Sequence, residues 1–227
     1  MSSHPQCARC KRAYCLNSPV EEIDKSLLPS FCPMRNAEQV IESALLAYND
    51  ERIKKIYLAS SITEKRAYDI VRGTLMPVYP RIREVIEFCS LIGAKKLGVA
   101  FCTGLQDEAA RVVDVLEGSG FTVLSVRCKC GAIDKMKLSI PSEYKIQGPA
   151  KYEAACNPVA QAYILNEAGT DLNIIVGLCI GHDILFTMYS KAPVTTLIVK
   201  DRLLGHNPVI ALYSNYHKGI IRPFSEP

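Results

Sequence analysis

Short apolar runs alternate with amphipathic stretches after residue 94, and this alternation restricts the possible folds more than any other feature. The apolar runs cover residues 95–102, 121–128, 172–179 and 194–202. The stretches between them space their apolar residues as helices do, most clearly after Thr103, over 157–169 and from His182 onward. Strands that alternate with helices form β-α-β units whose strands run parallel. We therefore predict an α/β fold, a Rossmann-like parallel sheet flanked by helices.

The first 93 residues lack this alternation. Residues 1–35 are rich in cysteine and proline, which is typical of a loop region organised by a metal. Residues 36–93 space their apolar positions as helices do, and Cys89 on one such face is predicted to be a buried core thiol. We divide the chain into a Cys-rich metal-binding segment plus helical region (1–93) and a Rossmann-like α/β domain (94–227).

Charge and hydropathy exclude two classes of partner. The 27 basic residues are interspersed with 23 acidic ones, so the chain has no basic patch for nucleic acid. No apolar run approaches the roughly 20 residues of a membrane span, and the N-terminus lacks the apolar core of a signal peptide. We expect a cytoplasmic protein, whose ten cysteines stay free of disulfides and point to metal or redox chemistry.

Cysteines stand at the ends of the predicted strands, where open α/β sheets bind their ligands. Three of these strands end in a cysteine and a fourth cysteine precedes a helix, namely Cys102, Cys128, Cys179 and Cys156. We predict that these four converge as thiolate ligands of a cofactor, with His182 or Cys130 as a substitute or neighbouring group. The alternative is that each is an ordinary buried small residue.

Titratable side chains crowd the same edge of the predicted sheet. The candidates for catalytic roles are His182, Asp183, Lys200, Asp201, Arg202 and His206. His206 has a second interpretation as a turn residue. A small anionic substrate could be oriented by Arg127, Lys129, Lys200 and Arg202, which could equally balance a metal centre or face solvent. The stretch after the first strand offers one glycine where a dinucleotide loop needs several, so no nicotinamide cofactor is expected.

A second cysteine group lies near the N-terminus, where Cys7, Cys10, Cys15 and Cys32 offer four thiolates in a segment with little apolar content. Metal binding would supply the folding energy of such a segment. Structural zinc sites usually have two matched Cys-x2-Cys pairs, and here only one exists. A final Cys-Pro is typical of ferredoxin-type runs. We favour an iron-sulfur (4Fe-4S) cluster here, with zinc as the alternative.

The run from Cys156 to Pro208 resembles an uncharacterised prokaryotic family that is frequent in anaerobes and is described in genomes as metal-binding proteins of unknown function. The N-terminal cysteines match the proposed metal site of that family. Its other motifs match Cys102, Cys128, Cys156, Cys179, His182, Lys200, Asp201, Arg202, His206 and Asn207. The resemblance implies a metal and makes iron-sulfur more plausible, but it implies no activity.

These observations lead to two functional hypotheses. The first is an iron-sulfur enzyme of redox or lyase type, with one or two 4Fe-4S clusters. Its strand-end centre would contact the substrate, and its N-terminal centre would pass electrons from an electron-transfer partner. The second is a non-catalytic zinc-binding protein, metal carrier or sensor. An open coordination position would distinguish the enzyme from the carrier.

Overall fold

The computed structural model describes residues 4–221. The chain forms two compact units that divide between Ser61 and Ile62. The predicted division after residue 93 concerns segments of different type, a Cys-rich and helical region and an α/β domain, and it stays a prediction. The first unit contains short helical turns and ends in two longer helices; its elements are η1 (Cys7–Arg9), α1 (Tyr14–Asn17), η2 (Val20–Glu22), η3 (Lys25–Leu27), α2 (Pro33–Asn36), α3 (Glu38–Ala47) and most of α4 (Glu51–Arg66).

A β-hairpin interrupts the region that was predicted to be helical. Strands β1 (Tyr68–Val71) and β2 (Thr74–Pro77) pair antiparallel between α4 and α5 (Arg81–Ile92). The turn between them places Arg72 and Gly73 at φ angles of 52° and 80°. Two successive positive φ angles are typical of the type I′ turn, whose twist matches that of a hairpin. An all-helical reading of residues 36–93 is thus wrong in this stretch.

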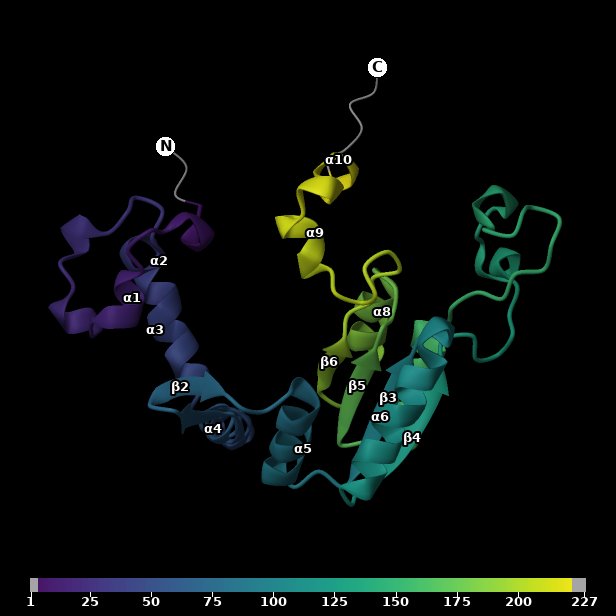
Figure 1. The fold of residues 1–227 in the computed structure, drawn as a ribbon, viewed down its shortest axis with the longest axis horizontal. Helices are drawn as coiled ribbons and strands as arrows, with labels where there is room; N and C mark the ends of the chain where they lie inside the picture. Colours follow the sequence, from purple (N-terminus) through teal and green to yellow (C-terminus); the bar gives the residue numbers. More distant parts are fainter. Residues whose placement is uncertain (1–3, 222–227) are drawn as a thin grey trace. The chain divides into compact units, whose positions relative to one another are not determined.

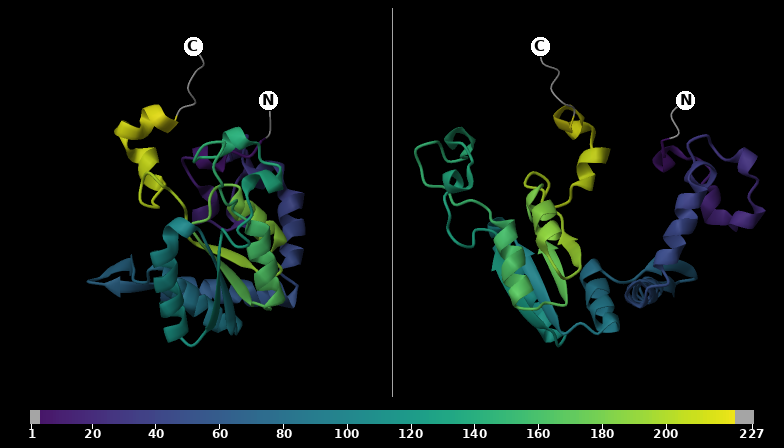
Figure 2. Two further views of the ribbon diagram at one scale, coloured as in Figure 1. Left: turned by 90° about the vertical axis from the view of Figure 1, so that its right-hand side faces the viewer. Right: turned by 180° about the vertical axis from the view of Figure 1, so that it is seen from behind.

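The second unit contains the predicted parallel sheet. Its strands are β3 (Lys96–Phe101), β4 (Thr122–Arg127), β5 (Leu172–Val176) and β6 (Val194–Ile198). They lie in the order β4-β3-β5-β6, and every neighbouring pair is parallel. Helix α6 (Gln106–Gly118) lies in front of the sheet in Figure 1, and α7 (Pro158–Glu167) lies in front in the view from behind (Figure 2). The α/β fold class is confirmed.

The strand order reverses direction at the two central strands, β3 and β5. The connection after β3 leads to β4 on one side, and the later strand β5 pairs on the other side of β3. Ligands of open α/β sheets bind at this switch point, beyond the carboxyl ends of the strands. Every residue of β5 is buried, as are five of the six residues of β3. The core therefore holds this edge rigidly.

Side chains of the core also tie the edge together. Gln161 of α7 is fully buried, and its Nε2 donates hydrogen bonds to the carbonyl oxygens of Phe101 (3.3 Å) and Val126 (2.6 Å). Phe101 is the last residue of β3 and Val126 the last but one of β4, the two strands that lead to Cys102 and Cys128. On α5, Cys89 is fully buried, which confirms the prediction of a core thiol. Burial raises the pKa of this thiol to about 12, so it stays protonated.

Two segments follow the strands at this edge. Residues 128–157 form a long loop, hereafter the edge loop, with turns η5 (Lys135–Leu138) and η6 (Ser142–Tyr144). It extends beyond the carboxyl ends of the strands in Figure 1. Helix α8 (His182–Tyr189) follows β5, and α9 (Val209–Tyr213), η7 (Asn215–His217) and α10 (Lys218–Ile221) follow β6. Over residues 4–221, none of the helices combines the length and the apolar character that a bilayer crossing requires.

Candidate functional site

The four cysteines at the predicted strand ends lie around one cavity. Cys102 directly follows β3, Cys128 directly follows β4, and Cys179 lies three residues beyond β5. Cys156 arrives by the edge loop, which doubles back so that the Asn157 amide donates a 2.7 Å hydrogen bond to the Cys128 carbonyl. All four line a cavity of about 630 Å³. Three separate connections, of which the edge loop contributes Cys128 and Cys156, therefore bring four thiols to one place.

The thiols contact one another and two cations. The Sγ atoms of Cys128 and Cys156 are 3.8 Å apart. The Thr103 amide donates a hydrogen bond of 3.3 Å to the Cys128 sulfur. Lys200 Nζ lies 2.8 Å from Cys102 Sγ. On the other side, Arg202 Nη2 lies 2.8 Å from Cys179 Sγ.

These contacts lower the pKa of two of the thiols and raise the pKa of a third. The Cys128 thiol, the Lys200 ammonium and the Gly104 amide stabilise the Cys102 thiolate and lower its pKa to about 4. Cys128 likewise lowers the pKa of Cys156 to about 4, with help from His182. The two neighbouring thiolates and burial in turn raise the pKa of Cys128. At neutral pH, Cys128 thus keeps its proton between two thiolates.

Two further groups of the site, the Cys179 thiol and the His182 imidazole, have raised pKa values. Burial, together with the charge on Cys102, raises the pKa of Cys179 in spite of the nearby Arg202. The hydrogen bond to Cys156 raises the pKa of His182. His182 Nδ1 is buried and has no hydrogen-bond partner among the described residues. Such an atom costs free energy unless water or a ligand satisfies it.

The predicted catalytic residues divide into two groups. His182, Lys200 and Arg202 line the cavity with the cysteines, whereas the other three do not. Asp183 lies in the first turn of α8, and its Oδ1 accepts a hydrogen bond of 2.8 Å from the adjacent Ile184 amide.

The two other residues outside the cavity, Asp201 and His206, build a turn. Asp201 Oδ1 accepts hydrogen bonds from the amides of Leu203 and Leu204, and the Asp201 amide lies 3.2 Å from His206 Nδ1. The backbone of His206 has a φ of 67°. This geometry agrees with the alternative interpretation of His206 as a turn residue.

Two further residues near the predicted edge lie outside the cavity lining. Arg127 donates to the Gln106 side chain, and its guanidinium lies 5.9 Å from the centre of the Phe101 ring. Cys130 places its sulfur 3.9 Å from the Asn157 carbonyl oxygen, and burial raises the pKa of its thiol. Lys129 does line the cavity and donates a hydrogen bond to the Ala154 carbonyl.

Sequence reasoning missed one wall of the cavity. The edge loop contributes Lys135, Leu138, Ile140, Tyr144, Ile146 and Glu153 to the lining. The available signal was the length of this segment, because long loops in compact domains are usually functional or disordered. A second signal was the presence of large apolar residues in a stretch that lacks helical or strand periodicity.

The expectation of metal ligands remains a prediction. Across residues 4–221, no three His, Cys, Asp or Glu side chains are arranged so that they could hold a metal ion as they stand. At the N-terminus, Cys7 and Cys15 are exposed, while Cys10 and Cys32 are partly buried. All four are free thiols. At the sheet edge the donor set itself fits a thiophilic metal, because four thiols share one cavity and two of them are thiolates.

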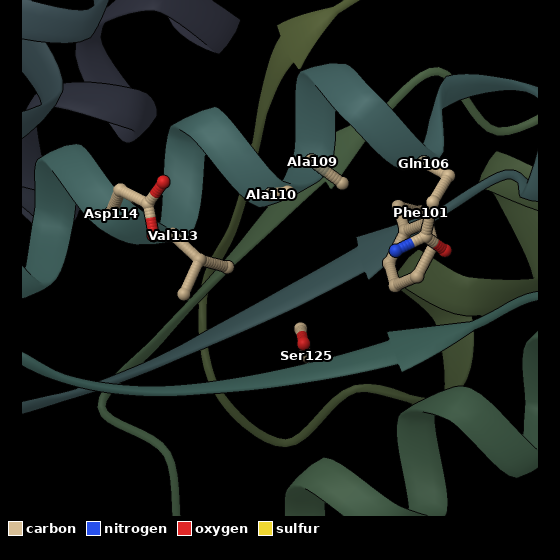
Figure 3. Close-up of a pocket in the computed structure, with 7 residues that line it drawn as sticks. All are labelled: Phe101, Gln106, Ala109, Ala110, Val113, Asp114 and Ser125. Carbon is tan, nitrogen blue, oxygen red and sulfur yellow. The ribbon is translucent and has the colours of Figure 1, made fainter.

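A second, smaller cavity of about 240 Å³ lies between α6 and β4 (Figure 3). Its lining consists of Phe101, Gln106, Ala109, Ala110, Val113, Asp114 and Ser125. Asp114 is the sole ionisable group in this lining, which contains no thiol or imidazole. The larger cavity at the sheet edge is therefore the candidate functional site.

Comparison with known proteins gives two matches. The model of a family described as "Protein of unknown function (DUF1847)" matches residues 32–197. Uncharacterized protein MJ0455 of Methanocaldococcus jannaschii is 51% identical over 156 residues, which are 69% of this chain and 77% of that protein. The matched family segment includes the four cysteines of the cavity and Cys32, whereas Cys7, Cys10 and Cys15 precede it. The resemblance to an uncharacterised family is confirmed, and metal binding by that family stays a prediction.

Proposed function

The chain belongs to the DUF1847 family of unknown function, and we propose that it is a metalloprotein whose centre is bound by Cys102, Cys128, Cys156 and Cys179. The observation that carries this proposal is the convergence of four thiols, from three separate connections, on one cavity. Two of these thiols are thiolates at neutral pH, and thiolate is the form that binds metals. Lys200 and Arg202 would offset the negative charge of a tetrathiolate centre.

We favour a 4Fe-4S cluster, because four thiolates are its usual ligand set and the cavity volume exceeds the needs of a single ion. One observation favours zinc instead. Zinc–sulfur bonds of about 2.3 Å in a tetrahedron place the sulfurs about 3.8 Å apart. The Cys128 and Cys156 sulfurs already have a separation of 3.8 Å. Either centre requires the thiols to turn towards a common point.

The reaction that we propose is of redox or lyase type on a small anionic substrate. A bound cluster with four cysteine ligands would supply an electron, and it would supply a Lewis-acidic iron only with one of the four cysteines off its iron. Lys129, Lys200 and Arg202 would hold the anion, since all three line the cavity. His182, whose pKa Cys156 raises, is placed to hold a proton there. If all coordination positions are closed, the protein is a metal carrier or sensor instead.

The N-terminal cysteines are proposed to bind a second centre, 4Fe-4S or zinc. The proposal rests on their spacing and on the low apolar content of their segment. A 4Fe-4S cluster there would pass electrons between the catalytic centre and an electron-transfer partner.

The test is metal and sulfide analysis of protein purified without oxygen. A 4Fe-4S centre predicts brown protein with about four iron and four sulfide per centre. Cys128→Ser should remove the sheet-edge centre, whereas Cys10→Ser should remove the N-terminal one. Cys130→Ser is the matched control, because Cys130 belongs to the same loop but does not line the cavity. Colourless protein with stoichiometric zinc would establish the zinc alternative, and protein with neither metal would refute the proposal.

A further inference from the structure

The cavity has two walls of different chemistry. One wall carries the thiols and the cations. The other belongs to the edge loop and consists of Leu138, Ile140, Tyr144 and Ile146. The exposed fractions of these side chains are high for apolar residues, 68% for Tyr144 and 88% for Ile146. A contiguous exposed apolar patch beside polar groups marks a binding surface.

The apolar wall is pre-formed because ion pairs close the edge loop at its base. An isolated β-bridge joins Asp134 to Ala154. Lys145 is almost buried, and its Nζ lies 3.0 Å from an Asp134 carboxylate oxygen. Lys135 Nζ lies 2.5 Å from a Glu153 carboxylate oxygen. A loop held in this way loses less conformational freedom when it binds a ligand than an untethered loop would.

The charges of the cavity complement a single negative charge. Its lining contains four cations, Lys129, Lys135, Lys200 and Arg202, and one carboxylate, Glu153. Three of these cations already have side-chain partners, because Lys135 pairs with Glu153 and because Lys200 and Arg202 contact the sulfurs of Cys102 and Cys179. Lys129 donates to a backbone carbonyl instead, that of Ala154. Its positive charge is therefore the one available to a ligand.

We propose that the cavity binds a small organic monoanion, a carboxylic acid that carries an apolar chain or ring. The carboxylate would face the cations, and the apolar part would lie against Leu138, Ile140 and Ile146 of the edge loop. This inference rests on the proposed function for the chemistry that follows binding, since it names the substrate class of the same site. Binding itself needs only the cavity.

The charge and the apolar wall of the cavity exclude compact polyanions as the preferred ligand. Inorganic phosphate or a short dicarboxylate would bring more negative charge than the cavity balances and would leave the apolar wall in water. Burial of the ligand's apolar part against that wall contributes to affinity in proportion to the area removed from water. Affinity should therefore grow with the length of the chain.

The experiment is a calorimetric titration of the full chain with acetate, butyrate, hexanoate and octanoate. We expect affinity to rise with each methylene, by up to about fourfold for complete burial. Hexanamide, which lacks the charge, should bind more weakly than hexanoate. Ile146→Asn should flatten the dependence on chain length, whereas Met136→Asn should preserve it, because Met136 lies in the same loop but outside the lining.

A second pair of variants tests the contact between the ligand's carboxylate and the cations of the cavity. Lys129→Gln should weaken all four acids by a similar factor, because Lys129 holds the charge available to the carboxylate. Lys137→Gln removes a cation of the edge loop that lies outside the lining, and it should leave the affinities unchanged. Equal affinity for all four acids, or for hexanamide and hexanoate, would overturn the inference. So would inorganic phosphate that binds more tightly than octanoate.

Metal analysis of the same samples separates this inference from the proposed function. Chain-length-dependent binding by protein that contains no metal would support the inference and refute the metal centre. Metal-loaded protein that binds none of the acids would support the centre and refute the inference.

Discussion

Replacing Lys200 with methionine should raise the pKa of the Cys102 thiol by about 1 to 3 pH units, the usual effect of an opposite charge at this range. Lys200 Nζ lies 2.8 Å from the thiolate sulfur. At an effective dielectric constant of about 20, unit charges at this distance interact by about 6 kcal/mol, which is about 4 pH units. The expected change is smaller because Lys200 is partly exposed to solvent.

The pKa should not return to its ordinary value. The largest cause of the lowered pKa of Cys102 is the neighbouring Cys128 thiol, and the variant keeps both this thiol and the Gly104 amide. We therefore expect a pKa between about 4 and the ordinary value of 9.0 for Cys102 in the variant.

The assay is alkylation of metal-free protein by iodoacetamide across pH, with each cysteine followed in its own peptide by mass spectrometry. The midpoint of the pH–rate profile reports the thiol pKa, whereas a rate at one pH also reflects nucleophilicity. Cys156 is an internal reference, because Cys128 and His182 set its pKa and Lys200 does not. Lys137→Met is the matched control. An unchanged Cys102 midpoint, or an equal change at Cys156, would refute the role of Lys200.

Three further predictions concern the scaffold around the site. Gly177→Ala should destabilise the protein by about 2–4 kcal/mol in urea denaturation, because a Cβ at φ +68° would lie 2.5 Å from a Leu105 carbon; Gly118→Ala meets nothing within 4 Å and should be neutral or stabilising. Gln161→Leu should cost about 1–3 kcal/mol, since it removes two hydrogen bonds at the strand ends, and an unchanged midpoint would contradict this role. Asp134→Asn should open the edge loop to trypsin at pH 7. Hydrogen bonds from the loop backbone and Lys145 lower the Asp134 pKa to about 2, so its stabilisation is present above about pH 4 and lost as pH falls towards 2; a variant cleaved no faster than wild type at pH 7 would exclude this role.

The parallel sheet was predictable because its two central strands, β3 and β5, are buried on both faces. Such burial produces a nearly continuous apolar run in each strand, and helices of period 3.6 separate the runs. Cys102 and Cys128 then follow directly from the rule that parallel strands end at one edge. The hairpin of β1 and β2 was missed because all eight of its strand residues are exposed, so burial imposed no alternation on the sequence.

Sequence by itself determined the α/β fold and the residues at the strand ends. Tertiary structure alone decided which groups meet there. Cys156 joins Cys128 because the edge loop doubles back through a backbone hydrogen bond, and no local pattern encodes that contact. Asp201 lies in the same motif as Lys200, yet its carboxylate caps a turn. Periodicity reports which face of an element is buried, whereas the direction of a side chain in a loop depends on contacts distant in sequence.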